Sequence, residues 1–344
     1  MKIKVISLFM FLMCLTSFAQ QFKTPVDYLN FISKEQVTIS KSTWNFIKAQ
    51  AHSKSDRRIN ATRKTVIKNI QSVSQKISAL KDGYNGDVEY RDQIVQYFSF
   101  LENYMNEDLG KIIDLQVAAE KSYDDMELYI TANEMVEAKM NTENDKVNLA
   151  QKQFCAKYHI TLTSEMDDLD KKMALSSEVF KYQSALYLIY FKCSITANKL
   201  SAAVNANDLS MIQQFGNSLI SYSNEGLEKL KTIKPYNGDS TLLITTRKTL
   251  EAFQKSGTQF VPKIVDFLMF NEKFEAAKKT LDSKSDKDRT QEEVDNYNSL
   301  VKEANKQIDN YNKNNASNTQ EINGVFANWD AASENFINSH VPND

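Results

Sequence analysis

Apolar side chains recur at alternating spacings of three and four residues along much of this chain, which is the period of one face of an α-helix. The longest stripe, interrupted by the polar residues Asn315 and Asn318, consists of Val294, Tyr297, Val301, Ala304, Ile308, Tyr311, Ile322, Val325, Trp329, Ala332 and Phe336. This heptad pattern predicts one long helix with coiled-coil character. Its start is marked by Thr290-x-x-Glu293, a capping-box sequence.

A second stripe of the same kind, from Met126 to Phe154, predicts another long helix in the first half of the chain. Shorter helices are expected ahead of each long one. In the first half they cover about 26–52, 58–82 and 88–106, and in the second half about 165–204, 208–233 and 240–256. The charged segment 281–289 is expected to be a surface loop.

A short motif appears twice, as Tyr84-Asn-Gly-Asp87 and as Tyr236-Asn-Gly-Asp239, 152 residues apart. The segments 111–115 and 120–121 recur at 263–267 and 272–273 with the same offset. We therefore expect two homologous halves, 20–160 and 161–344. Asn-Gly accepts the positive φ of a tight turn. Each motif is thus interpreted as a helix corner in which the Asp caps the next helix and the Tyr packs beneath. The alternative is a ligand loop, although one Asp and one Asn fall short of a calcium loop.

Composition supports a helical protein. The 344 residues include only 8 Gly and 4 Pro, and no Pro occurs between Pro25 and Pro235. Sheet proteins need many turns, and turns consume Gly and Pro. An apolar fraction of 42% excludes a disordered chain. The expected fold is all-α, an elongated helical bundle made of two homologous multi-helix halves, each ending in a long helix.

The N-terminus has the pattern of an export signal. Lys2 and Lys4 precede an apolar run at 5–15, and small residues before Gln20 predict removal of residues 1–19. Lipidation at Cys14 is the alternative, but Met13 stands where a small residue is required. No later apolar stretch approaches the ~18 residues of a membrane span. We expect an exported chain that is periplasmic, displayed on the outer surface or secreted.

Residues that carry chemistry are sparse. His52, His159 and His340 have no partner at metal-ligand spacing, and no phosphate loop or nucleophile elbow occurs. Cys155 and Cys193 are expected to be free, buried thiols, because the predicted helices hold them far apart. The sequence predicts neither a metal nor a cofactor, and it favours a non-enzymatic protein.

One charge asymmetry suggests a binding surface. From Lys48 to Lys81 there are nine Lys or Arg and a single acid. The candidate anion site consists of His52, Arg57, Arg58, Arg63 and Lys64. Its expected partners are an envelope polyanion, such as a glycan or lipid head group, or another protein. Nucleic acid is not expected, because no aromatic residues are interleaved for base stacking. The simpler alternative is that this segment pairs inside the bundle with the acidic stretch 101–148.

Several segments together resemble a known family. They are 27–32, 51–58, 111–115, 119–126, 234–239 and 340–342. The chain resembles exported surface proteins of Bacteroidetes-type bacteria and leptospires that have no assigned activity. This resemblance implies a helical fold and an envelope location, and it supplies no catalytic residues.

The sequence therefore favours an exported helical protein that binds a ligand or has a structural role in the envelope. One alternative is an enzyme of unrecognised type, which would need a pocket holding His52, Arg57 or Arg58, and a carboxylate. The other is an assembly protein whose heptad stripe pairs with another chain.

Overall fold

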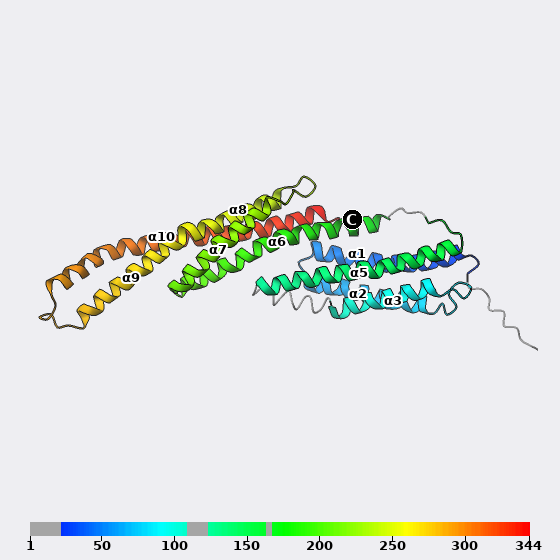
Figure 1. Ribbon diagram of the computed structural model, residues 1–344, viewed down its shortest axis with the longest axis horizontal. Helices are drawn as coiled ribbons and strands as arrows, with labels where there is room; N and C mark the ends of the chain where they lie inside the picture. Colours follow the sequence, from blue (N-terminus) through cyan, green and yellow to red (C-terminus); the bar gives the residue numbers. More distant parts are fainter. Residues whose placement is uncertain (1–21, 109–122, 163–166) are drawn as a thin grey trace, which may run out of the picture.

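The computed structural model describes residues 22–108, 123–162 and 167–344, and all regular elements in these ranges are helices (Figure 1). The all-α prediction is confirmed. The predicted signal peptide 1–19 and the repeated segments at 111–115 and 120–121 lie outside the described residues.

The first unit packs its helices around one hydrophobic cluster. It consists of α1 (Pro25–His52), α2 (Asp56–Ser78), α3 (Glu89–Asn103), the π-helical turn η1 (Tyr104–Asp108) and α5 (Tyr123–Lys157). Ile32, Ile70 and Ile94 are almost fully buried in this cluster. Apolar faces of α1, α2 and α3 thus explain the helices predicted at 26–52, 58–82 and 88–106.

The second unit is larger. It consists of α6 (Asp168–Asn205), α7 (Leu209–Leu230), α8 (Thr241–Lys255), the π-helical turn η2 (Ser256–Phe260), α9 (Val261–Asp282) and α10 (Gln291–His340). The helices expected from the sequence did not include α9, which contains Pro262. This proline occupies the first turn of the helix, where its missing N–H costs no hydrogen bond.

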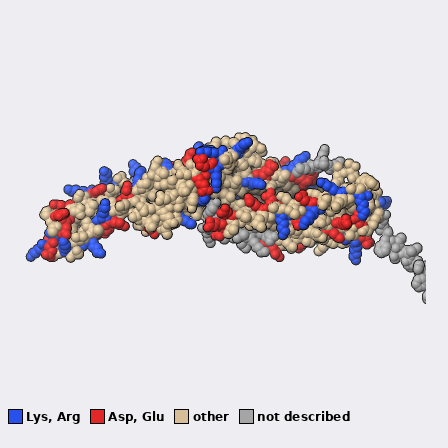
Figure 2. Space-filling model, in the orientation of Figure 1, with Lys and Arg blue, Asp and Glu red and all other residues tan. Residues whose placement is uncertain are grey.

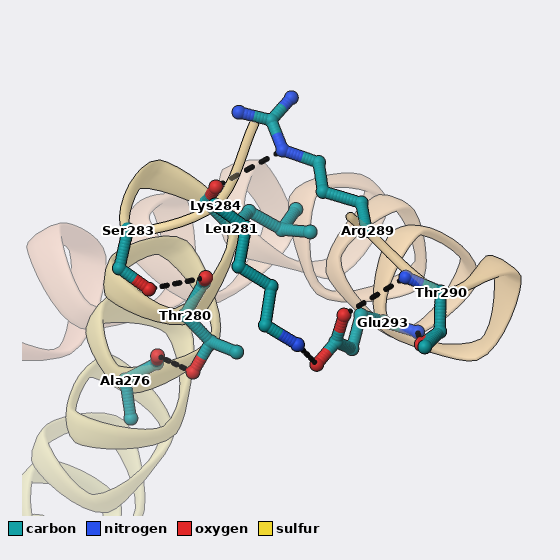
Figure 3. A network of polar contacts seen from close by, with 8 residues as sticks. All are labelled: Ala276, Thr280, Leu281, Ser283, Lys284, Arg289, Thr290 and Glu293. Carbon is teal, nitrogen blue, oxygen red and sulfur yellow. Dashed lines mark hydrogen bonds and ion pairs between the residues drawn. The ribbon is translucent and has the colours of Figure 1, made fainter. Parts of the chain in front are cut away.

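The far ends of α9 and α10 project from the bundle as a two-helix hairpin (Figure 1). Polar contacts fix the tip of this hairpin (Figure 3). Lys284 pairs with Glu293, whose carboxylate also accepts from the backbone N–H of Thr290 at 3.0 Å. Arg289 Nε donates to the carbonyl oxygen of Leu281 at 3.0 Å. Within the predicted loop 281–289, Leu281 and residue 282 instead end α9, and only the remainder forms the turn.

Helix α1 contributes to both units. Phe46 lies in the cluster of the first unit, whereas Trp44 belongs to the cluster of the second, where α1 contacts α6 and α10. The indole Nε1 of Trp44 also donates to the main-chain oxygen of Asp344 at 3.2 Å. The C-terminal residues are thereby held against α1.

Both repeated motifs lie at corners between helices, between α2 and α3 and between α7 and α8. Asn85 and Asn237 have positive φ, as do the following glycines. Neither Asp is the N-cap residue of the following helix, because Ser240 is the N-cap of α8 and Val88 that of α3. Asp239 accepts from the backbone N–H of Thr241 at 2.8 Å, whereas Asp87 pairs with Lys157 instead.

Candidate anion-binding pocket

An open pocket of about 450 Å³ lies where α1 ends and α2 begins. Its lining comes from three segments: Ser42, Asn45, Lys48 and His52 on α1, Ser53 with Arg58, Thr62 and Thr65 on and before α2, and Asn343 near the C-terminus. On each helix these residues are three or four positions apart, so they share one face. The pocket is therefore formed by two facing polar stripes.

The lining is cationic. Lys48 and Arg58 supply two permanent charges, and no Asp or Glu side chain lines the pocket within the described chain. Hydroxyl and carboxamide groups provide the remaining polar atoms. Such a lining favours an anionic ligand and offers hydrogen bonds to other oxygens of the same molecule.

The base of the pocket is tied to the second unit. His52 Nδ1 lies 2.9 Å from Asn338 Oδ1, and Lys54 Nζ lies 2.7 Å from a carboxylate oxygen of Glu334. His52 Nε2 is shielded from solvent and has no hydrogen-bond partner in the described chain. These contacts place the pocket at the junction of the two units, a common position for ligand sites.

The structure separates the five residues of the predicted anion site. His52 and Arg58 line the pocket together. Arg57 and Lys64 are exposed but lie outside the lining. Arg63 points elsewhere, because its guanidinium donates to the carbonyl oxygen of Met105 at 3.3 Å.

Lys48 was counted in the basic segment but not among the predicted site residues. The polar face that it shares with Ser42, Asn45 and His52 was visible in the sequence, because these residues follow helical spacing within a predicted helix. The contribution of Asn343 was not visible, because it depends on contacts between distant parts of the chain.

The basic segment reaches only the start of the acidic stretch 101–148 among the described residues, where Gln71 bonds to Glu102 and Arg63 to the carbonyl oxygen of Met105, and residues 109–122 of the stretch lie outside the described ranges. Helix α2 packs on α1 and α3, whereas α5 packs on α3 and α6. The ion pairs of the segment that lie within the described ranges join Lys54 to Glu334 and Lys76 to Glu35. Neither of these carboxylates belongs to the acidic stretch, and Arg57, Arg58 and Lys64 are exposed.

Other chemistry is limited in the part of the chain that the structure describes. No group of three or more His, Cys, Asp or Glu side chains there could hold a metal ion, and none of the described helices could cross a membrane. Cys155 and Cys193 are free and buried in separate hydrophobic clusters. Burial raises the pKa of the Cys193 thiol to about 12, which disfavours the reactive thiolate.

Comparisons with family models, curated proteins and solved structures found no match to this chain. The site therefore has to be interpreted from its own geometry, and the family resemblance of the sequence stays a prediction.

Proposed function

We propose that this chain is an exported, non-enzymatic binding protein whose junction pocket holds an acidic saccharide. The observation that carries the proposal is the juxtaposition of Lys48, His52 and Arg58 in one open pocket, where no described residue of the lining is a carboxylate. Two cations on separate helices suit a sulfate or phosphate group. The surrounding hydroxyl and carboxamide groups suit the hydroxyls of a sugar.

The size of the pocket favours a saccharide over a lone inorganic anion. Its volume of about 450 Å³ falls within the ~300–1,000 Å³ of typical ligand sites. His52 Nε2 is shielded and lacks a partner among the described residues, which costs roughly 1–3 kcal/mol and which a ligand would relieve only after the shielding side chains moved aside.

Binding is favoured over catalysis. The enzyme alternative requires a carboxylate beside His52 and an arginine, and the pocket brings together His52 and Arg58 with hydroxyls and amides instead. Asn338 Oδ1, 2.9 Å from His52 Nδ1, can orient the imidazole, but it carries no charge to stabilise the protonated ring as a carboxylate would.

The test is calorimetric titration with a sulfated heparin oligosaccharide and with its desulfated counterpart. We expect the sulfated probe to bind with an affinity that falls as salt increases, because exposed charges are screened over ~10 Å at 0.1 M. The double variant Lys48→Gln with Arg58→Gln should lose about tenfold or more in affinity.

A matched control removes the same charge outside the pocket. Arg57→Gln with Lys64→Gln neutralises two exposed cations of the same region. This control should retain most of the affinity. Equal losses in both double variants would mean diffuse attraction to the basic segment, and would overturn the pocket as the site.

We also propose that the two units arose by duplication. The spacing of the described elements supports this, since α3 and η1 begin at residues 89 and 104 while α8 and η2 begin at 241 and 256. Both pairs are therefore separated by the same 152 residues as the repeated motif. An experimental structure in which the two units fail to superpose around Tyr84 and Tyr236 would contradict it.

Export to the envelope, and membership in the family of surface proteins that the sequence resembles, belong to the same proposal. Both agree with a binding protein for extracellular saccharides. Intact-mass analysis of the protein purified from its cell envelope should give a chain that begins near Gln20 without acyl chains. A lipidated Cys14 would instead indicate a membrane-anchored form.

The assembly alternative rests on one observation. Val301 and Ile308, seven residues apart on α10, are 40% and 45% exposed where the α9–α10 hairpin projects. A sedimentation experiment on the wild type and on Val301→Lys with Ile308→Lys separates the cases. Self-association that is lost in the variant would favour assembly through the heptad stripe.

A further inference from the structure

A second pocket, of about 170 Å³, lies between the C-terminal part of α6, η2 and the middle of α10. Its polar lining is dominated by asparagine carboxamides: Asn198 and Asn205 on α6, and Asn315, Asn318 and Asn323 on α10. None of the five carboxamides hydrogen-bonds to another group of the described chain. Each therefore keeps donors and an acceptor available.

Among the described residues, the lining contains no ionisable side chain. A neighbouring pocket that shares Asn318 contains charges that are already engaged: Lys255 pairs with Glu321 at 2.8 Å, and Lys263 Nζ donates to Asn314 at 3.2 Å. In Figure 2 the surface between the charged hairpin tip and the charged band at the middle of the molecule is largely free of Lys, Arg, Asp and Glu. This environment does not select an ion.

Two of these asparagines stand where the apolar stripe of α10 would place hydrophobic residues. The stripe runs to Tyr311 and resumes at Ile322, and Asn315 and Asn318 fall between them. Both are half-buried and face α6 and η2 across the pocket. Asparagine is a poor residue for a helix interior, so two in this position cost helix stability that leucine would not.

The lining also includes apolar side chains and one buried serine. Phe260 and Leu200 are 7% and 3% exposed, and Ser256, which opens η2, is 4% exposed. The Ser256 hydroxyl makes no hydrogen bond within the described chain. π-helical turns of this kind frequently occur at functional sites.

We infer that this pocket binds an uncharged, hydroxyl-rich ring of the size of one sugar residue. Carboxamides offer a donor and an acceptor together, which matches the paired hydroxyls of a sugar. The apolar side chains match the C–H face of such a ring. The volume is well below the ~300–1,000 Å³ of sites for drug-sized ligands, so a single ring fills it. The pocket is separate from the junction pocket and differs from it in charge.

The test is saturation-transfer NMR with neutral hexoses, N-acetylhexosamines and their methyl glycosides as probes. At least one probe should receive saturation from the protein. Binding of the methyl glycosides as well as the free sugars indicates the terminal residue of a glycan, and binding of the free sugars alone indicates a monosaccharide. Absence of transfer to every probe would overturn the inference.

Variants locate the site. Asn315→Leu with Asn318→Leu should lose about tenfold or more in affinity. The same variant should melt at an equal or higher temperature, because leucine continues the apolar stripe. The matched control, Asn310→Leu with Asn312→Leu, alters exposed positions of the same helix and should keep binding.

A second variant guards against a folding defect in the first. Asn198→Ala with Asn205→Ala removes two carboxamides from the opposite wall without touching α10, and should also abolish saturation transfer. Undiminished transfer in both pocket variants would place the sugar elsewhere. Lys48→Gln with Arg58→Gln should leave this binding unchanged, so the two pockets can fail independently.

Discussion

At each of the two corners, the corner tyrosine belongs to a cluster of four rings, and the rings of the two clusters come from corresponding places in the two units. Each has a tyrosine from the first helix of the unit, the corner tyrosine, a phenylalanine near the end of the last helix, and a ring four residues later. These are Tyr28, Tyr84, Phe154 and Tyr158 at one corner, and Tyr182, Tyr236, Phe336 and His340 at the other. Contacting ring centroids are 4.6–6.1 Å apart in the first set. In the second set they are 4.7–5.4 Å apart.

The ion pair that closes each corner differs. Asp87 pairs with Lys157 at 2.8 Å, while the neighbouring Tyr158 supplies the ring. At the other corner His340 does both, because its ring packs on Tyr236 and its Nε2 lies 2.9 Å from Asp239. Lysine is charged at any physiological pH, whereas histidine is charged only when protonated. The same geometry thus gives one permanent ion pair and one that depends on pH.

The backbone also leads into the two corners differently. Gly83 precedes Tyr84 with φ +55°, a conformation suited to glycine, whereas Pro235 precedes Tyr236. Both connections therefore form the same turn at Asn-Gly but approach it by different backbone paths. The two corners therefore share the ring cluster and the Asn-Gly turn. They differ in the residue before the corner tyrosine and in the ion pair.

The largest loss of stability should follow substitutions in the ring cluster that the two corners share. Phe154 and Phe336 are both 3% exposed. Phe154→Ala and Phe336→Ala should each lower the free energy of unfolding by about 3–5 kcal/mol, because each leaves a cavity among rings. Chemical denaturation measures this, with Phe→Leu at the same positions as a milder control. A loss confined to one corner would break the similarity.

The next largest losses of stability should differ between the residues that precede the two corner tyrosines. Gly83→Pro should cost about 3 kcal/mol or more, because proline cannot adopt φ +55° and a Cβ at this position would lie 1.9 Å from the carbonyl oxygen of Asp87. Pro235→Gly should cost only about 1 kcal/mol, through the entropy of the unfolded chain. Chemical denaturation again gives both values. Similar losses in the two variants would mean that the two paths are equivalent after all.

A smaller change in stability should appear at acid pH, through Asp239. Hydrogen bonds from His340 and Thr241 lower the pKa of Asp239 from 3.8 to about 2. Because the folded pKa is the lower one, the stabilisation is complete above about pH 4 and is lost as the pH falls towards 2. Asp239→Asn should remove about 1 kcal/mol at pH 5, after allowance for solvent screening, and much less at pH 2.

Thermal melts across this pH range measure the acid effect. Asp309→Asn, at an exposed position of α10, is the control and should follow the wild type. A constant difference between Asp239→Asn and the wild type at all pH values would contradict the assigned linkage.

The smallest effect should follow loss of the lysine at the first corner. The Lys157 side chain is 61% exposed, although that of Asp87 is only 7% exposed, so water screens this ion pair from the lysine side and limits its contribution. Lys157→Met should lower the melting temperature least of these variants. A double-mutant cycle with Asp87→Asn isolates the pair, and a coupling as large as the loss in Phe154→Ala would show that the ion pair dominates the corner.

Much of the helical fold could be predicted from the sequence. Apolar periodicity located α1, α2, α3 and the long helices, because each buries one continuous face. Asn-Gly located both corners, because positive φ is a local requirement. The pattern did not show that Asp87 prefers Lys157 to a cap, since these residues are 70 positions apart in the chain.

The junction pocket was predicted only in part. The run of basic residues from Lys48 to Lys81 indicated His52 and Arg58. However, charge alone could not separate them from Arg57, Arg63 and Lys64, because the direction of each side chain depends on which helices pack together. The asparagines of the second pocket appeared in the sequence only as an interruption of the stripe. The sequence did not show that α6 and η2 face these asparagines and form a pocket with them.

The placement of Trp44 and Phe46 in different hydrophobic clusters has a consequence for any attempt to divide the molecule. A truncated chain that ended near residue 160 would carry the indole of Trp44 into water. A chain that started near residue 167 would expose the surfaces of α6 and α10 that α1 covers. The boundary between the predicted halves is therefore not a suitable place to truncate the chain. Fragments made there should be more prone to aggregation and proteolysis than the intact protein.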